Sequence, residues 1–277
     1  MSSMSRLQLP RGLVEQRCEL LRSLHVLGSP LMLPNAWDVT SAKEVVAAGF
    51  PVVATTSGGV AATLGYEDHQ NAPADEMLAA AARIARSAGV PVTVDAEAGY
   101  GMAPDDLVDA LLEVGAAGCN LEDTDHATGR LVDSSRHAEW LAAVRSAAAE
   151  RDYGLVINAR IDVFIGSDAQ TQPRLLDEAI SRSRAYLAAG ADCVFPILLN
   201  EGDLIATFVK AVRAPVNVLA VPSAPPTARL AQLGIARISY GSLIQRRAMQ
   251  DLASYLATLT TSLPPALKPD ASREPNL

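Results

Sequence analysis

The sequence predicts an α/β barrel of eight parallel strands, each followed by a helix, and three observations support this. Short apolar runs alternate with helix-length segments eight times between Leu31 and Leu259. Glycine closes most of these helices just before the next strand, as at Gly89, where it can supply a left-handed residue. The 277 residues also suit one barrel domain of roughly 250 residues. An open doubly wound sheet is the alternative, but the sequence lacks the Gly-x-Gly-x-x-Gly turn of its nucleotide-binding members.

The predicted elements follow in order along the chain. Leucines recur at helical spacing over residues 11–27 and predict an N-terminal helix that caps the domain. Strands are predicted at 31–34, 51–55, 92–95, 118–121, 155–158, 193–195, 216–218 and 237–240. Helices are predicted at 41–48, 75–88, 105–114, 135–150, 173–189, 204–212, 227–233 and 243–259. One barrel domain should therefore span residues 10–260, with flexible ends at 1–9 and at the proline-rich 261–277.

Composition excludes several classes of protein. The net charge is −8 and no basic patch stands out, which argues against a nucleic-acid partner. No apolar run approaches the ~20 residues that a membrane span needs, and no signal peptide is evident, so a cytoplasmic protein without a membrane partner is expected. The spacing of the three cysteines suits neither a zinc site nor a disulfide framework. Cys119 and Cys193 lie in apolar runs and are predicted to be core residues.

Two neighbouring predicted strands end in acids. Asp95 and Glu97 follow one strand, and Glu122 and Asp123 follow the next. Parallel strands of a barrel end at the same rim, where barrel enzymes place their active sites. Carboxylates gathered there would repel one another and raise each other's pKa, which a hard divalent cation would offset. We therefore predict a Mg²⁺ site at Asp95, Glu97 and Glu122; helix capping or pairing with arginines is the structural alternative.

Other polar residues at the same rim could bind a substrate. The second strand is followed by three small residues, Thr56, Ser57 and Gly58. Their backbone N–H groups and hydroxyls can hold a carboxylate. Asn120 belongs to the fourth strand. Arg160 stands in an apolar run, where it can grip a substrate carboxylate or form a salt bridge to Asp162 or Glu122, and both roles stay open.

Loops after the strands carry possible proton-transfer groups. Asp68 lies in a polar loop after the second strand and could position the substrate or move a proton. No two histidines have metal-ligand spacing, so His69, His126 and His137 are expected at the surface. Asp68 or His126 is the candidate for a proton step in C–C cleavage.

Six blocks in order resemble the isocitrate lyase/phosphoenolpyruvate mutase superfamily. They are Leu33–Asp38, Thr55–Ala61, Leu64–Asp68, Val94–Gly101, Asn120–Thr124 and Ile157–Asp162, and the resemblance covers residues 24–259. It implies a barrel whose last helix is exchanged between subunits, in dimers that pair into tetramers. It also implies Mg²⁺ (or Mn²⁺) bound by Asp95, with Glu97 and Glu122 mostly acting through water. Arg160 would then steady the reacting oxygens, with Asp68 near a small carboxylate substrate.

Departures from the family narrow the prediction. The lyases carry a Lys-Lys/Arg-Cys-Gly-His loop, whereas residues 125–131 read Asp-His-Ala-Thr-Gly-Arg-Leu. The Lys and the Asn-Ser pair of the phosphorus–carbon enzymes are also missing from this loop. Glu97 replaces the commoner Asp, and Ile161 replaces the usual Thr.

The resulting hypothesis is a Mg²⁺-dependent lyase that acts on a small 2-oxo or 2-hydroxy (di)carboxylate through an enolate. Arg160, Asp68 and Glu122 would be its catalytic residues. The reaction would be C–C cleavage or decarboxylation of an oxaloacetate-like acid. Two alternatives stay open: mutase or hydrolase chemistry at a P–C bond, and a non-catalytic protein that binds a 2-oxo acid such as 2-oxoglutarate.

Overall fold

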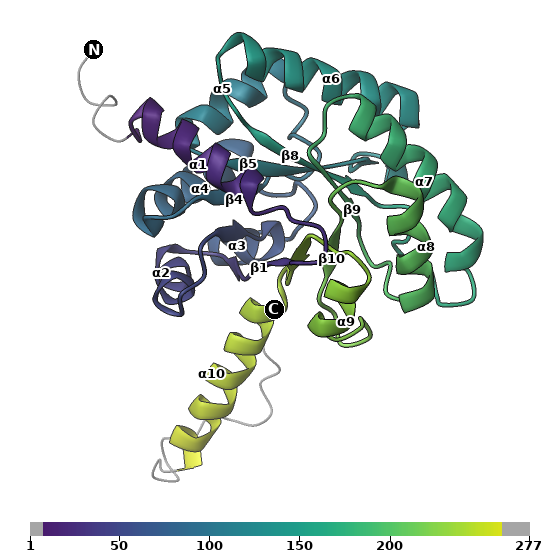
Figure 1. Cartoon of the computed structure of the whole chain (residues 1–277). Helices are drawn as coiled ribbons and strands as arrows, with labels where there is room; N and C mark the ends of the chain where they lie inside the picture. Colours follow the sequence, from purple (N-terminus) through teal and green to yellow (C-terminus); the bar gives the residue numbers. More distant parts are fainter. Residues whose placement is uncertain (1–7, 262–277) are drawn as a thin grey trace.

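Residues 8–261 are described by a computed structural model, in which parallel strands form a central barrel surrounded by helices (Figure 1). Each predicted strand is present, and the first is divided at Pro34. Proline cannot donate a backbone hydrogen bond, which accounts for the interruption. The strands are β1 (Leu31–Leu33), β2 (Asn35–Ala36), β3 (Val53–Thr55), β4 (Val92–Asp95), β5 (Gly118–Glu122), β8 (Val156–Ile161), β9 (Cys193–Pro196), β10 (Asn217–Leu219) and β11 (Arg237–Ser239).

The strand order closes the barrel. One sheet runs β2-β3-β4-β5-β8-β9 and the other runs β1-β11-β10, with parallel pairing throughout both. A parallel bridge between Val194 and Val216 joins β9 to β10, and the chain runs directly from β1 into β2. Within residues 8–261 the two sheets are therefore one closed barrel of eight strands, and the alternative open sheet is wrong.

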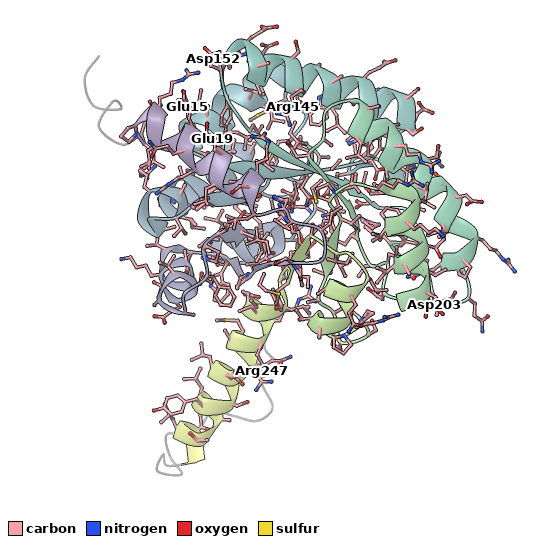
Figure 2. The ribbon with its side chains drawn as sticks, in the orientation of Figure 1. Glu15, Glu19, Arg145, Asp152, Asp203 and Arg247 are labelled. Carbon is pink, nitrogen blue, oxygen red and sulfur yellow. The ribbon has the colours of Figure 1, made fainter. Side chains whose placement is uncertain are left out.

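Helices pack around the barrel, and charged side chains such as Asp152, in a turn after a helix, and Asp203, in a helix, lie at its outer edge (Figure 2). The predicted helices are α1 (Arg11–Ser23), α2 (Val39–Ala47), α4 (Ala74–Ala88), α5 (Pro104–Val114), α6 (Ser134–Glu150), α7 (Gln172–Ala188), α8 (Gly202–Val212), α9 (Thr227–Gln232) and α10 (Leu243–Thr261). Three elements were not predicted: α3 (Ser57–Leu64) and an antiparallel hairpin of β6 (Thr124–Asp125) and β7 (Arg130–Leu131).

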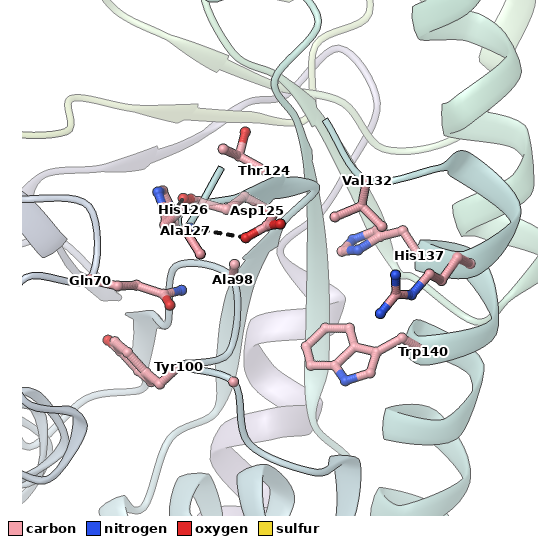
Figure 3. Close-up of a pocket in the computed structure, with 13 residues that line it drawn as sticks. Gln70, Ala98, Tyr100, Thr124, Asp125, His126, Ala127, Val132, His137 and Trp140 are labelled. Carbon is pink, nitrogen blue, oxygen red and sulfur yellow. Dashed lines mark hydrogen bonds and ion pairs between the residues drawn. The ribbon is translucent and has the colours of Figure 1, made fainter. Parts of the chain in front are cut away.

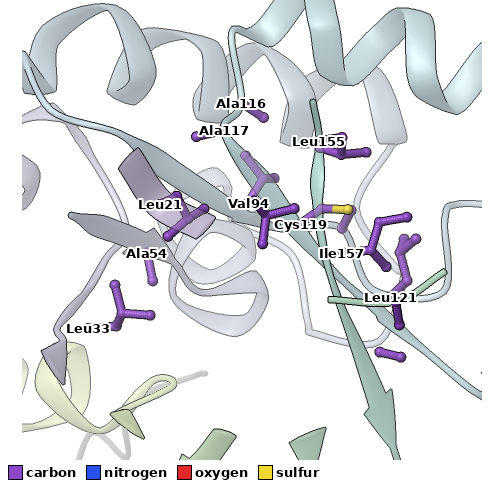
Figure 4. Close-up of a cluster of buried hydrophobic side chains, with 14 of the residues drawn as sticks. Leu21, Leu33, Ala54, Val94, Ala116, Ala117, Cys119, Leu121, Leu155 and Ile157 are labelled. Carbon is purple, nitrogen blue, oxygen red and sulfur yellow. The ribbon is translucent and has the colours of Figure 1, made fainter. Parts of the chain in front are cut away.

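The core combines strand side chains with the inner faces of the helices (Figure 4). Cys119 and Cys193 are fully buried, which confirms their predicted place. The capping helix α1 lies very close to the start of β5: a Cβ atom at Gly118 would lie 2.8 Å from Leu21 Cδ2 and 2.7 Å from the carbonyl oxygen of Val156. Glycine is therefore needed at this contact.

The last helix, α10, projects away from the barrel (Figure 1). Large apolar side chains remain exposed along it: Met249, Leu252, Tyr255, Leu256 and Leu259. No helix within residues 8–261 has the length and apolar character needed to cross a membrane. Of the predicted flexible ends, residues 1–7 and 262–277 lie outside the described residues, while Leu9 packs against the core.

Candidate active site at the carboxyl rim of the barrel

The register of neighbouring strands brings the predicted acids together. Asp95 of β4 pairs with Asn120 of β5, and Glu122 of β5 pairs with Arg160 of β8. Glu97 follows β4 and is joined to β5 by a hydrogen bond from the Glu122 amide to the Glu97 carbonyl. The predicted convergence at one rim is therefore present, and we call Asp95, Glu97, Glu122, Arg160 and His126 the rim site.

Asp95 links the strands to α3. Its Oδ2 accepts a hydrogen bond from the backbone N–H of Ser57 at 3.1 Å, and its Oδ1 lies 3.4 Å from the donating Nδ2 of Asn120. Its own backbone N–H donates to the Thr55 hydroxyl at 2.8 Å. These three contacts position a half-buried carboxylate that still faces the rim.

Glu97 is held in a conformation that few side chains adopt. Its φ angle is +50°, in the left-handed region that is uncommon outside glycine. Its side chain is 2% exposed, and Oε1 accepts a hydrogen bond from the Gln70 backbone at 2.7 Å. Burial and the neighbouring charge of Asp95, with smaller contributions from Glu122 and Asp68, raise the pKa of Glu97 to about 7. The folded chain thus disfavours the full negative charge of this cluster.

Glu122 lies between Arg160 and His126. Arg160 forms an ion pair with Oε2, and His126 Nε2 lies 2.5 Å from Oε1. Burial raises the pKa of Glu122, while Arg160 and His126 oppose that rise. The hydrogen bond that joins Glu122 and His126 in turn raises the pKa of the imidazole.

Arg160 forms both of the salt bridges that were predicted as alternatives to substrate binding. Its Nε and Nη2 donate to the two oxygens of Asp162 at 2.6 and 2.8 Å, and Nη1 contacts Glu122. Burial alone would lower the pKa of Arg160. The carboxylates of Glu122 and Asp162 have the larger combined effect and raise it. A guanidinium has five N–H donors, so one donor on each Nη atom stays available to a ligand.

Thr56, Ser57 and Gly58 form the start of helix α3, which was not predicted. Thr56 is the N-cap of α3, and its hydroxyl lies 2.8 Å from that of Ser242. Helix N-termini favour anions, and because the Ser57 N–H already donates to Asp95, the N–H groups from Gly58 onward are the ones that could hold a carboxylate. Asp68 lies over it, as expected for a carboxylate near the substrate: a Cβ atom at Gly58 would be 2.6 Å from Asp68 Oδ2.

The histidine predictions were wrong for two of the three residues. His69 is exposed as expected, although its ring centroid lies 5.5 Å from that of His126. His126 belongs to the rim site, because the β6–β7 hairpin turns it back onto Glu122. His137 is only 5% exposed, and burial lowers its pKa to about 4. Neither hairpin nor burial could be inferred from histidine spacing alone.

A buried polar layer lies beneath Asp95, and the sequence reasoning missed its central residue. Arg237 of β11 is 1% exposed and donates to Asn120 Oδ1 at 3.1 Å, which also accepts from Asn158 at 2.9 Å. Asn120 is thereby fixed below the rim, and its role as a substrate ligand stays a prediction. An arginine in an apolar run was the signal that singled out Arg160, and Arg237 in Ile235–Ser239 shows the same signal.

The donor set of the rim site fits a divalent cation. Its acids are oxygen ligands only, and burial together with the charge of Asp95 raises the pKa of Glu97, which a cation would offset. Within residues 8–261, however, no three acidic, histidine or cysteine side chains are placed so that they could hold one ion directly.

Comparisons with known proteins agree with this geometry. A family model described as phosphoenolpyruvate phosphomutase matches residues 21–260. An uncharacterised protein of Mycobacterium tuberculosis is 37% identical over 79% of this chain and 81% of its own length. The 2-methylisocitrate lyase of Escherichia coli is 30% identical over 68% of this chain and 64% of the lyase.

Solved structures give the same result. A candidate phosphonomutase from Burkholderia cenocepacia is 42% identical, with a TM-score of 0.83 over 87% of this chain and 99% of that chain. An oxaloacetate acetylhydrolase bound to oxalate is 23% identical, with a TM-score of 0.77 over 92% of this chain and 91% of that chain. At this identity the similarity supports a shared fold and no shared activity. The family model spans most of the chain, so the protein belongs to the phosphoenolpyruvate phosphomutase family, within the isocitrate lyase/phosphoenolpyruvate mutase superfamily.

Proposed function

We propose that the protein is a Mg²⁺-dependent carbon–carbon lyase that acts on a small 2-oxo or 2-hydroxy dicarboxylate. The observation that carries the proposal is the arrangement of the rim site, in which Arg160 and the start of α3 accompany three acids on neighbouring strands. Such a site combines an anion-binding helix start with donors for a developing negative charge. Mg²⁺, or Mn²⁺, would be held by Asp95 directly and by Glu97 and Glu122 through water, and would supply Lewis-acid stabilisation of an enolate.

Substrate binding follows from the donors that face the rim. The α3 start at Thr56, Ser57 and Gly58 would hold the carboxylate next to the reacting carbon, and Asn120 would line the base of the site. The remaining donors of Arg160 would contact the oxygen that becomes negatively charged as the C–C bond breaks. Asp162 keeps the guanidinium plane fixed through two hydrogen bonds, so no rearrangement is needed.

A proton must then reach the new carbanion. In decarboxylation of an oxaloacetate-like acid, the bond to the departing carboxylate breaks, CO₂ leaves, and its electron pair forms the enolate. His126, which shares a hydrogen bond with Glu122, would deliver a proton to the carbon and restore the 2-oxo acid. Asp68 would stand on the other side, over the start of α3. The lyase Cys is therefore not required for this reaction.

The decisive assay uses a panel of 2-oxo, 2-hydroxy and phosphono acids with Mg²⁺, read by product analysis. We expect turnover of a 2-oxo or 2-hydroxy dicarboxylate. Cleavage of a P–C bond instead would establish the phosphonate alternative, for which the phosphomutase family model is the supporting observation. Tight binding of 2-oxoglutarate with no turnover of any acid would establish the non-catalytic alternative and reject the lyase.

We also propose that the protein is a homo-oligomer, a dimer or a dimer of dimers, whose subunits exchange α10. The support is the row of exposed apolar residues along this helix, including Leu252, Leu256 and Leu259 at helical spacing. A groove of about 510 Å³ beside Trp37, Phe50 and Ile244 is available to receive a helix. Leu256→Glu should convert the oligomer to monomers in light scattering, whereas the outward Arg247→Glu change should not.

A further inference from the structure

A pocket beside the rim site carries groups that the proposed reaction does not use. It has a volume of about 420 Å³, within the range of roughly 300 to 1,000 Å³ that is typical of small-molecule sites. Glu122 and His126 line it as well, so it is continuous with the rim site. We call it the outer pocket, and the residues that matter for its chemistry are Gln70, Tyr100, Val132, Arg136, His137 and Trp140.

The walls of the outer pocket are largely aromatic. Figure 3 shows Gln70 and Tyr100 on one side and the rings of His137 and Trp140 on the other. The latter two rings are stacked, with centroids 5.7 Å apart and 29° between their planes. Val132 adds an aliphatic contact. These walls suit a hydrocarbon chain better than a charged or strongly hydrated group.

Polar donors without partners also line this pocket. The Nε2 atoms of Gln70 and His137 are buried without a hydrogen-bond partner among the described residues, and His137 is 5% exposed. Within residues 8–261 the guanidinium of Arg136 has no hydrogen bond or ion pair. A buried polar atom without a partner destabilises the fold. A ligand group that accepts a hydrogen bond would satisfy Gln70 Nε2, whereas His137 Nε2 can donate or accept according to its tautomer.

The acids that line the pocket are already occupied. Glu122 binds Arg160 and His126, as described above. Asp125 accepts hydrogen bonds within its own hairpin, from the Ala127 backbone and the Thr128 hydroxyl, both at 2.9 Å. These hydrogen bonds lower the pKa of Asp125 and the charge of Arg136 adds to their effect, but the guanidinium forms no ion pair among the described residues, so its donors remain available to a ligand. An ionised carboxylate only accepts hydrogen bonds, and an arginine can bind it with two parallel donors.

We propose that the outer pocket binds the distal arm of the substrate: an apolar carbon chain that passes between Tyr100 and Trp140 and ends in a second carboxylate held by Arg136. The inference rests on the proposed function, because the rim site must hold the 2-oxo acid end of the same molecule. It narrows the substrate class to dicarboxylates longer than oxaloacetate and so favours C–C cleavage within the chain over decarboxylation of an oxaloacetate-like acid. Gln70 donates to a polar group near the reacting end of that chain.

Calorimetry with Mg²⁺ present tests the proposal on four probes. Oxalate occupies the rim site alone, 2-oxoglutarate and 2-oxoadipate carry arms of increasing length, and 2-oxohexanoate has the chain of 2-oxoadipate without its second carboxylate. We expect Arg136→Gln to weaken 2-oxoadipate binding at least about tenfold and to leave oxalate affinity unchanged. Arg130→Gln, at an exposed hairpin arginine that does not line the pocket, should leave all four affinities unchanged.

The results separate this inference from the proposed function. Absence of oxalate binding to the unmodified protein would reject the rim-site proposal. Normal oxalate binding with equal 2-oxoadipate affinity in Arg136→Gln would overturn the outer-pocket inference alone. Equal affinity of the unmodified protein for 2-oxoadipate and 2-oxohexanoate would overturn it as well. Arg136 is exposed, so the variant should keep the unmodified melting temperature, and Arg136→Lys should restore part of the affinity.

Discussion

Glu122 and Asp123 are adjacent acids at the end of β5, and both are almost completely buried, at 2% and 0% exposure. Successive side chains of a strand point to opposite faces, so they face different surroundings. Glu122 faces the barrel interior and the rim site. Asp123 faces the helix layer, where Arg182 and Tyr186 of α7 contact it, and we call these three residues the outer network.

The two acids differ in what their partners can do. Both oxygens of Asp123 accept from fixed donors: the Asp162 backbone at 2.9 Å, Arg182 at 3.0 Å and the Tyr186 hydroxyl at 2.7 Å. Glu122 shares Oε1 with His126, which can donate or accept according to its tautomer. Fixed partners produce stability, whereas an adjustable partner leaves a group able to change its protonation. An acid with fixed partners and an acid with an adjustable partner are therefore neighbours in the sequence.

Asp123→Asn should cause the largest loss of stability among the variants of these two regions. The new amide group must turn its NH₂ toward donors in either orientation, which leaves buried polar atoms unsatisfied and Arg182 without its carboxylate. We expect a loss of about 3 kcal/mol in the free energy of unfolding, measured by urea denaturation. Asp152→Asn, at an exposed acid, should cost less than about 0.5 kcal/mol. A loss of that small size at Asp123 would remove the distinction between the two acids.

Glu122→Gln should weaken ligand binding and leave stability nearly unchanged. Its amide oxygen can face Arg160 while its NH₂ donates to His126, so we expect the free energy of unfolding to change by less than about 1 kcal/mol. Oxalate affinity in the presence of Mg²⁺ should instead fall by about ten- to a hundredfold, because a charged group near the cation is lost. Destabilisation equal to that of Asp123→Asn would show that both acids are structural.

The sequence predicted the positions of both acids but not this difference. Short apolar runs, glycine helix ends and acid-tipped strands are local signals, and they sufficed for the eight strands and for the convergence of Asp95, Glu97 and Glu122. The partners of Asp123 lie far along the chain, with Arg182 separated from it by 59 residues. The alternation of side chains along a strand shows that Glu122 and Asp123 point to opposite faces of the sheet. It does not show which donors lie on each face.

Two other features of the site could not be derived for related reasons. The start of α3 has glycines at positions 58 and 59, which favour a turn locally, and packing of Val60 and Ala61 in a small apolar cluster outweighs that preference. His126 reaches Glu122 only because the hairpin reverses the chain within a few residues. Tertiary contacts decided both outcomes, and no periodic pattern marked either of them.

Tyr186→Phe tests the outer network with a smaller change. It removes the 2.7 Å hydrogen bond that the hydroxyl donates to Asp123 and keeps the ring in place. A hydrogen bond to a charged acceptor is worth about 1.5 kcal/mol or somewhat more, and we expect a loss of that size in urea denaturation. Oxalate affinity should not change. Altered oxalate binding would show that the outer network and the rim site are coupled through β5.

His137 lies where the two regions meet, and its titration gives the smallest effect. Its ring contacts Tyr186 edge-on at 4.9 Å, and burial, followed by the charge of Arg182, lowers its pKa to about 4, with Asp162 opposing. The unfolded chain should bind a proton near pH 6.5. Stability from this group is therefore complete above pH 6.5 and is lost as the pH falls toward 4, because only the unfolded state gains the proton. At pH 5.5 we expect a loss of about 1 kcal/mol in the free energy of unfolding relative to pH 7.5.

His137→Phe tests this expectation, because phenylalanine keeps a ring but cannot titrate. Urea denaturation at both pH values should show the loss in the unmodified protein and not in the variant. Other groups, including His25, titrate in both proteins and cancel in the difference. An equal loss in both proteins would show that the titration of His137 does not contribute to the dependence of stability on pH.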